Sequence, residues 1–255
     1  RQEVQISKLE GQKTEELNHA KLQFFTNVTH ELMTPLTIIL TSLQNLNNGT
    51  GDNQTLYGVM SANATRLMRL IQQILEFRKV ESGNLKIRVS HGDVVGFVRR
   101  CVEAFAPLVA RKQLKVYFRA SSEQVDGWFD PDKLDKIVYN LLSNAAKYTP
   151  DKGEIIIRIE TGDDCSVCIL VANSGELMTQ QTIDGLFRRF YDGNYRKHHT
   201  IGTGIGLSLV KDLTDLHRGS IRVSSDEQDG NCFRITLPIG RDAYTEEEID
   251  DDTGD

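Results

Sequence analysis

The sequence predicts a multidomain chain in which an all-α helical hairpin is followed by an α+β domain. Over the first 80 residues the apolar positions return every three or four residues, which is typical of amphipathic helices. Gly11 and Pro35 are the only helix breakers before residue 49. After a turn at residues 81–84, short β-rich stretches alternate with helical ones, which indicates a mixed domain of about 155 residues.

The composition excludes several other classes. With 255 residues, 39% of them hydrophobic, the chain is too apolar for a disordered protein, and its 20 glycines and 5 prolines are too few for a collagen-like one. We find no run of about 18 apolar residues and no signal-peptide pattern, so we expect a soluble segment without membrane contact. The cysteines are predicted to be small core residues rather than a metal or redox site, because the pair at 165 and 168 has no second ligand pair.

The first predicted element is one long helix, kinked at Pro35, whose apolar stripe runs from Ile6 to Leu46. A turn at residues 47–53 precedes a second amphipathic helix from Leu56 to Phe77. A lone hairpin cannot cover both apolar stripes. We therefore expect two chains to complete a four-helix bundle.

The α+β domain is predicted from alternating short segments. The expected strands are residues 85–89, 114–120, 154–160, 165–172, 219–225 and 231–239, and the expected helices are residues 92–112, 131–147 and 205–217. Beyond Pro238 the chain becomes acidic, with seven carboxylates and no basic group in residues 245–255. This run predicts a disordered linker or tail, and the preceding residues are close to neutral.

A first candidate site lies in residues 24–37. On a helix, His30 is expected to project from the polar side of the stripe, with Glu31 beside it and Thr34 one turn further on. An exposed imidazole next to a carboxylate suits nucleophilic attack, because the carboxylate can orient the ring and take its proton. The alternative is a solvated surface histidine with an incidental ion pair.

A second candidate site lies in residues 130–150. Asn140, Asn144 and Lys147 fall at i, i+4 and i+7 and so share one face of a helix. Two carboxamides and an ammonium along one stripe suit a polyphosphate and its hydrated Mg²⁺. A plain solvated face is the alternative.

A glycine-rich segment, residues 199–213, is the third candidate. Gly202, Gly204 and Gly206 allow close backbone approach, and a helix beginning near Ile205 would present free N–H groups to phosphate. A simple helix cap is the alternative. Neither a dinucleotide-binding fingerprint nor a P-loop fits, because no strand precedes the glycines in a βαβ unit and the GK(S/T) ending of a P-loop is missing.

Taken together, these segments resemble the core of a sensor histidine kinase over residues 15 to 240. THELMTPL resembles the phosphoacceptor box of that family, NLLSNAAKYTP its N box, LFRRFY its F box and GTGIGL its second glycine box, in the expected order. The C-terminal details are most similar to hybrid two-component regulators of the Bacteroides type. The resemblance implies a signalling helix with a dimerisation and phosphotransfer hairpin at 1–83, an α/β-sandwich ATP-binding domain of the histidine kinase, Hsp90 and gyrase type at 84–240, and an acidic tail or linker at 241–255.

The resemblance also implies roles for individual residues. His30 would accept the γ-phosphoryl group of ATP, Glu31 would act as base, and Thr34 would position water for dephosphorylation of a partner. The cofactors would be ATP and Mg²⁺, with Asn144 as the metal ligand. The implied nucleotide-binding residues are Asn140, Asn144, Lys147, Tyr148, Asn173, Gly175, Arg189, Gly202, Thr203, Gly204, Gly206 and Leu207.

Two further implications concern the chemistry. Asn140 occupies the place where related ATPases carry a catalytic glutamate, and an amide cannot deprotonate water, so bound ATP would be kept for the histidine. Residues 175–203 would form a lid over the nucleotide. Its cationic side chains, which suit developing phosphate charge, are Arg188, Arg189, Arg196 and Lys197.

The implied partners are a second copy of the chain and the receiver domain of a response regulator, separate or fused in the parent chain, with no nucleic acid. The expected location is the cytoplasmic portion of an inner-membrane sensor.

Four positions depart from the family pattern. They are Met33 after HEL, Asn173 in place of the adenine-binding aspartate, Leu177 in place of a glycine, and Asp192 after FY. Met33, Asn173 and Leu177 favour one alternative, a degenerate kinase acting as a phosphatase or scaffold. Another alternative is a general ATPase related to chaperones and topoisomerases, against which Asn140 and the hairpin bearing His30 both argue.

Overall fold

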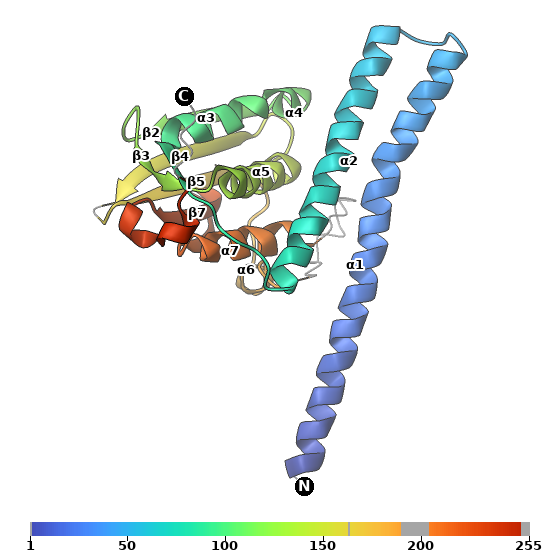
Figure 1. Cartoon of the computed structure of the whole chain (residues 1–255). Helices are drawn as coiled ribbons and strands as arrows, with labels where there is room; N and C mark the ends of the chain where they lie inside the picture. The colour runs from blue at the N-terminus through green and yellow to red at the C-terminus, as the bar shows by residue number, and fades with distance from the viewer. Residues whose placement is uncertain (1, 163, 190–203, 251–255) are drawn as a thin grey trace. The chain divides into compact units, whose positions relative to one another are not determined.

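The computed structural model describes residues 2–162, 164–189 and 204–250. Two compact units are present (Figure 1). The first, the helical unit, contains Arg1–Ser82 with Arg188–Gly206, and the second, the sheet unit, contains Gly83–Phe187 with Leu207–Asp255. No helix in the described part of the chain is long and apolar enough to cross a membrane.

The helical unit is built on two long antiparallel helices, α1 (Gln2–Asn47) and α2 (Asn53–Glu81), as the apolar periodicity predicts. α1 continues through Pro35, which lacks the N–H that would bond to the carbonyl of Glu31. The connecting turn places Gly49 at φ +65° and Gly51 at φ +94°, where a side chain would be strained. Asp52 then caps α2 by accepting a hydrogen bond from the backbone N–H of Thr55 at 2.8 Å.

The sheet unit is a layer of helices on a five-stranded sheet, which confirms the predicted α/β architecture. Its helices are α3 (Val94–Ala104), α4 (Ala106–Arg111), α5 (Pro131–Tyr148), α6 (Gln180–Gly185) and α7 (Gly206–Leu216). Its strands are β1 (Ser90–Asp93), β2 (Lys115–Ala120), β3 (Asp126–Phe129), β4 (Glu154–Gly162), β5 (Ser166–Asn173), β6 (Ser220–Asp226) and β7 (Gly230–Pro238). The sheet has the order β2-β4-β5-β7-β6, and β1 and β3 form a separate ribbon.

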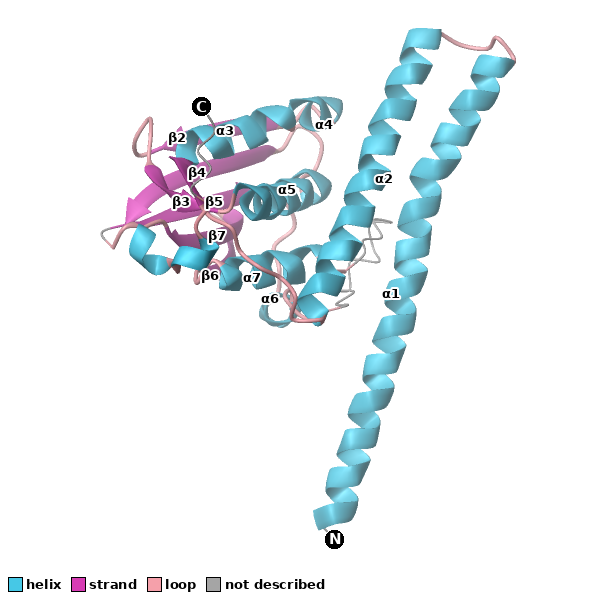
Figure 2. Cartoon of the chain, viewed as in Figure 1, coloured by secondary structure: helices cyan, strands magenta, loops and turns pink. Residues whose placement is uncertain are grey.

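One face of the five-stranded sheet carries the core. Ile155, Ile157 and Ile159 alternate along β4 and are buried, and α5 buries its own apolar stripe, which includes Ile137 and Leu141. Figure 2 shows α3, α5 and α7 against the same face of the sheet. All neighbouring strands are antiparallel except β2 and β4, which run parallel.

The strand predicted at residues 85–89 is wrong. The alternating apolar residues of this stretch do not join a strand; Ile87 and Val89 instead pack in a cluster with Tyr244, and Val89 forms a single bridge to Ile249. The β1–β3 ribbon begins directly afterwards, at Ser90. Both β1 and β3 are only four residues long, too short for periodicity to identify.

The prediction of a disordered acidic tail is wrong for residues 241–250. Two short 3₁₀ helices, η2 (Arg241–Ala243) and η3 (Glu246–Glu248), follow the last strand. Arg241 pairs with Glu246 at 3.0 Å, and Arg218 contacts both carboxylate oxygens of Glu248 at 2.8 and 2.9 Å. Part of the acidity is therefore neutralised by Arg241, five residues from Glu246, and by Arg218, 30 residues from Glu248.

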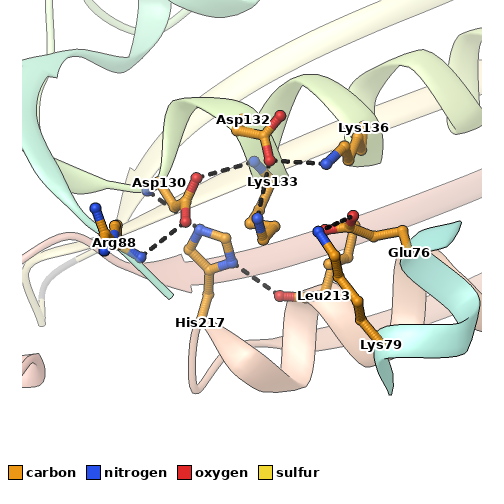
Figure 3. Close-up of polar contacts among 9 residues, drawn as sticks. All are labelled: Glu76, Lys79, Arg88, Asp130, Asp132, Lys133, Lys136, Leu213 and His217. Atoms are coloured by element: carbon orange, nitrogen blue, oxygen red, sulfur yellow. Dashed lines mark hydrogen bonds and ion pairs between the residues drawn. The ribbon is translucent and has the colours of Figure 1, made fainter. Parts of the chain in front are cut away.

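A buried polar joint ties α7 to the start of α5 (Figure 3). Asp130 caps α5 by accepting from the N–H of Lys133 at 3.0 Å and also accepts from the N–H of Arg88 at 2.8 Å. The ring of His217 is fully buried, with Nδ1 2.8 Å from the carbonyl of Leu213 and Nε2 accepting from the N–H of Asp130 at 3.3 Å. These contacts fix the neutral ring with its proton on Nδ1.

This joint predicts a loss of stability in acid. Burial lowers the pKa of His217 below its ordinary value of 6.5, against the opposing effects of the hydrogen bond to Leu213 and of the Asp130 carboxylate. Below that value the unfolded chain binds a proton that the folded chain does not, so stability falls as the pH drops, by up to about 1.4 kcal/mol per pH unit. Guanidinium unfolding at about pH 7.5 and about pH 5.5 checks this. His217→Gln is expected to reduce the pH slope, and an unchanged slope would contradict the assignment.

Candidate functional site

His30 lies on the exposed surface of α1. The hydroxyl of Thr34, one turn further on, donates to the backbone carbonyl of His30 at 3.0 Å. Met33, the first departure from the family pattern, is also exposed. The imidazole is therefore accessible to a reactant, as the sequence predicts.

Glu31 is held in place by Arg66, a residue that no sequence motif marks. Nη2 of Arg66, on α2, lies 2.8 Å from Oε2 of Glu31, and the Glu31 side chain is only 15% exposed. This pair crosses the hairpin next to His30 and holds the carboxylate in one place. No local pattern could indicate it, because 35 residues separate the partners.

The predicted polar face of α5 is present but not uniform. Asn144, Lys147 and Tyr148 are half-buried, with the Lys147 ammonium 5.3 Å from the centre of the Tyr148 ring. Asn140 is buried instead, and its amide donates to the carbonyl of Lys136 at 2.7 Å. The accessible part of the face is therefore its C-terminal half, which carries an amide, an ammonium and a phenol.

A lysine that the sequence does not single out holds the end of this helix. The Nζ atom of Lys112 donates to the carbonyls of Ala146, Lys147 and Thr149 at 2.8, 3.0 and 3.1 Å. A cation at the C-terminus of a helix also interacts favourably with the helix dipole. Lys112 thus fixes the backbone that carries Lys147 and Tyr148.

The segment after β5 lies against the end of α5. Asn173 is buried, and its amide donates to the carbonyl of Ser174 at 3.0 Å. A Cβ atom at Gly175 would lie 2.9 Å from the carbonyl oxygen of Tyr148, so only glycine permits this approach. The structure therefore brings Tyr148 next to Asn173 and Gly175, which lie some 25 residues further along the sequence.

Two further polar residues fix the same segment. Asn231 donates to the carbonyl of Glu176 at 3.0 Å and accepts from the hydroxyl of Ser225 at 2.7 Å. Ser225 in turn accepts from the N–H of Met178 at 2.8 Å. The sequence feature that could have pointed to Asn231 is an asparagine at the first position of the strand predicted at 231–239. Leu177, between these anchors, is exposed.

The remaining predicted residues are described in part. Gly204 has φ +70°, Gly206 begins α7, and Leu207 follows it. Within the helical unit, Arg189 lies 5.6 Å from the ring centre of Phe77, and Ile205 packs with Phe24 and Phe77. The predicted residues outside the described part of the chain are Asp192, Arg196, Lys197, Gly202 and Thr203.

The four cysteines lie in different environments. Within the described ranges, no group of three or more His, Cys, Asp or Glu side chains is placed to hold a metal ion. Cys232 is buried as predicted, but Cys165 is exposed in the β4–β5 turn at φ 48°, so its assignment to the core is wrong. Burial and the neighbouring Asp135 raise the pKa of Cys101 to about 12, which keeps this thiol protonated.

An apolar cavity of about 210 Å³ lies elsewhere in the sheet unit, between the α3–α4 region and strands β2 and β4. Its lining residues are Val102, Glu103, Phe105, Ala106, Val109, Val116, Phe118, Leu142 and Ile155. The only charged residue in this lining is Glu103, whose carboxylate would repel phosphate. The polar surface at the end of α5 is therefore the better candidate for a nucleotide, because Asn144 and Lys147 offer an oxygen ligand for Mg²⁺ and a cation for phosphate.

Two family models match the chain. The His Kinase A (phospho-acceptor) domain matches residues 20–83, and the histidine kinase-, DNA gyrase B- and HSP90-like ATPase matches residues 129–241. A curated relative, histidine kinase P4 from Formosa agariphila, is 35% identical over 251 residues. The match covers 96% of this chain but only 18% of that relative.

Solved structures share the fold. Full-length ShkA in complex with AMPPNP has a TM-score of 0.61 at 22% identity, covering 86% of this chain and 46% of that one. Histidine kinase ThkA in complex with response regulator protein TrrA has a TM-score of 0.57 at 20% identity, covering 89% of this chain and 66% of that one. With a phosphoacceptor domain followed by an ATP-binding domain, the chain belongs to the sensor histidine kinases and contains the core of that family.

Proposed function

We propose that this chain is an ATP-dependent histidine autokinase of a two-component system, which phosphorylates His30 and passes the phosphoryl group to an aspartate of a response regulator. The observation that carries the proposal is the exposed His30 beside the anchored Glu31, within the matched phosphoacceptor domain. The matched ATP-binding domain supplies the second half of the reaction.

In the proposed reaction, a nitrogen of His30 forms a bond to the γ-phosphorus of ATP while the bond from that phosphorus to the leaving ADP oxygen breaks. Glu31 takes the imidazole proton. Asn144 would ligate Mg²⁺, which neutralises phosphate charge when bound, and Lys147 would hold the phosphates. Arg189, Gly204 and Gly206 are further proposed nucleotide contacts, each implied by the family resemblance alone.

The apolar surface of the hairpin supports a homodimer. Large exposed apolar side chains line both helices, namely Leu22, Phe25, Leu36, Leu40, Leu43, Met68, Ile71 and Leu75. Such a surface is costly in water, and a second hairpin would bury it in a four-helix bundle. Sedimentation of the purified chain tests this.

A response-regulator receiver, separate or fused, is the proposed acceptor. The complex of ThkA with a response regulator supports such a partner for a chain of this fold. The proposed location is the cytoplasmic side of an inner-membrane sensor, as expected for the core of a sensor kinase.

Incubation with γ-labelled ATP and Mg²⁺ tests the proposed activity. We expect label on the protein that is lost in acid and kept in base, as for phosphohistidine. A label stable in acid, or none, would contradict an autokinase.

A phosphatase or scaffold function is the second candidate. It is favoured by Met33, which is exposed, and by Asn173 and Leu177, because all three differ from the residues that the family usually has at these positions. A phosphatase function predicts that the chain does not label itself with ATP but still removes phosphate from a phosphorylated receiver. Labelled receiver incubated with the unlabelled chain, with and without ATP, distinguishes the two functions.

Asn173→Asp is expected to bind ATP about fivefold more tightly. A carboxylate accepts a charge-assisted bond from the adenine amine, which is worth about 1 kcal/mol more than a neutral bond. The same change places a carboxylate next to the carbonyl of Ser174, so the nucleotide-free domain should lose about 1–3 kcal/mol. Nucleotide titration and thermal unfolding check both effects, with Asn173→Ala as the control that loses affinity. Equal affinity of the Asp and Asn forms would overturn the assignment.

A further inference from the structure

The face of the five-stranded sheet opposite the helices carries a row of arginines. Strand register sets five side chains side by side across all five strands, in the order Arg119, Arg158, Leu170, Arg234 and Arg222. Arg158 lies between the buried Ile157 and Ile159, which point towards the helices, so Arg158 and its row point the other way. We call these four arginines the arginine row.

The arginine row is costly for the isolated domain. Arg119 stands directly opposite Arg158, and Arg222 directly opposite Arg234, and like charges in directly opposite positions are destabilising. Glu160 lies 4.0 Å from Arg158 and 3.9 Å from Arg234, beyond hydrogen-bond length, and these side chains are 40–46% exposed. Such a pair contributes little. In the described part of the chain, Arg119 and Arg222 form no ion pair.

An apolar strip runs beside the arginine row. The neighbouring row contains Tyr117, Ile156, Ala172, Cys232 and Ser224. Tyr117 is 39% exposed, whereas Ala172 and Cys232 are buried in one cluster with Leu170. The face thus offers guanidinium groups over about 19 Å, four strand spacings, and the apolar surface that a partner can reach beside them is that of Tyr117 and the partly buried Ile156.

These features favour a polypeptide over a nucleic acid. Glu160, and Glu154 opposite Lys115, lie on the same face and leave only a small cationic excess, whereas tight phosphate-backbone binding takes many cationic contacts. Guanidinium groups pair with carboxylates in a bidentate way, and the apolar strip suits side chains between those carboxylates.

We propose that the arginine row binds a carboxylate-rich segment of a protein partner, with acidic side chains on the arginines and apolar ones against Tyr117 and Ile156 of the strip. This proposal does not depend on phosphotransfer. The chain's own acidic run is a weaker candidate, because Glu246 and Glu248 already pair with Arg241 and Arg218 elsewhere on the unit.

The test uses the full chain and a fluorescent peptide of alternating Glu and Leu, followed by anisotropy at about 50 mM salt. We expect saturable binding that the double variant Arg119→Gln, Arg222→Gln weakens about fivefold or more. The matched control removes two exposed arginines from α3, Arg99→Gln with Arg100→Gln, and should bind normally. Equal binding by the two double variants would overturn the proposal.

Two further measurements make the result specific. Because removing like charges relieves repulsion, the Arg119→Gln, Arg222→Gln variant should melt at the same temperature as the parent chain or higher, so loss of binding cannot reflect unfolding. Duplex DNA and vesicles containing phosphatidylserine serve as competing probes. Tighter binding of either, with the same dependence on Arg119 and Arg222, would replace the proposed protein partner by a nucleic acid or a membrane.

Discussion

His30→Gln is expected to abolish labelling of the chain by γ-labelled ATP. Glutamine retains a polar side chain of similar size, but its amide nitrogen is not a nucleophile, so no bond to phosphorus can form. Because His30 is exposed on α1, the substitution should change stability by no more than about 0.5 kcal/mol. The expected result is therefore complete loss of acid-labile label in a normally folded protein.

His91→Gln is the matched control. His91 is also exposed, in the sheet unit, where its ring packs edge-on against Trp128 with centroids 5.4 Å apart. This variant should label like the parent chain. If acid-labile label persisted in His30→Gln but disappeared in His91→Gln, the phosphoacceptor would lie in the sheet unit, and the assignment of His30 would be wrong.

Glu31→Gln is expected to slow autophosphorylation by about 10² to 10⁴-fold, the usual contribution of a positioned general base. The amide keeps the shape of the side chain but cannot take the proton of the imidazole. Single-turnover labelling at saturating ATP measures the loss at the chemical step. Circular dichroism should show an unchanged hairpin, since Arg66 is half-exposed and stays hydrated without its partner.

The variant Arg66→Gln distinguishes the role of the proposed base, Glu31, from that of the residue that holds it in place. This variant leaves the Glu31 carboxylate in place but removes the contact at 2.8 Å, so we expect less than a tenfold loss of rate. Wild-type labelling by Glu31→Gln would exclude Glu31 as the base. A larger loss in Arg66→Gln than in Glu31→Gln would make Arg66 the group that acts on the phosphate.

Much of the fold could be predicted because its signals are local. The apolar repeat of α1 and α2 and the alternation along β4 each arise within one segment, where side-chain period determines which face is buried. The same local logic identified His30 and the polar face of α5. It failed at residues 85–89, where an alternating segment forms only a single bridge, and at 241–250, where Glu248 meets Arg218, which lies 30 residues away.

Local patterns thus predicted the kind of each long element and the order of the two domains, and motifs marked His30 and the polar face of α5 as candidate sites. Which groups meet emerged only from the folded chain: Arg66 with Glu31, Lys112 with the end of α5, and four arginines from four strands in one row. The physical reason is that period and propensity act between residues a few positions apart. Strand register and helix pairing depend on burying apolar surface across the whole chain, so they bring together charges that no local pattern connects.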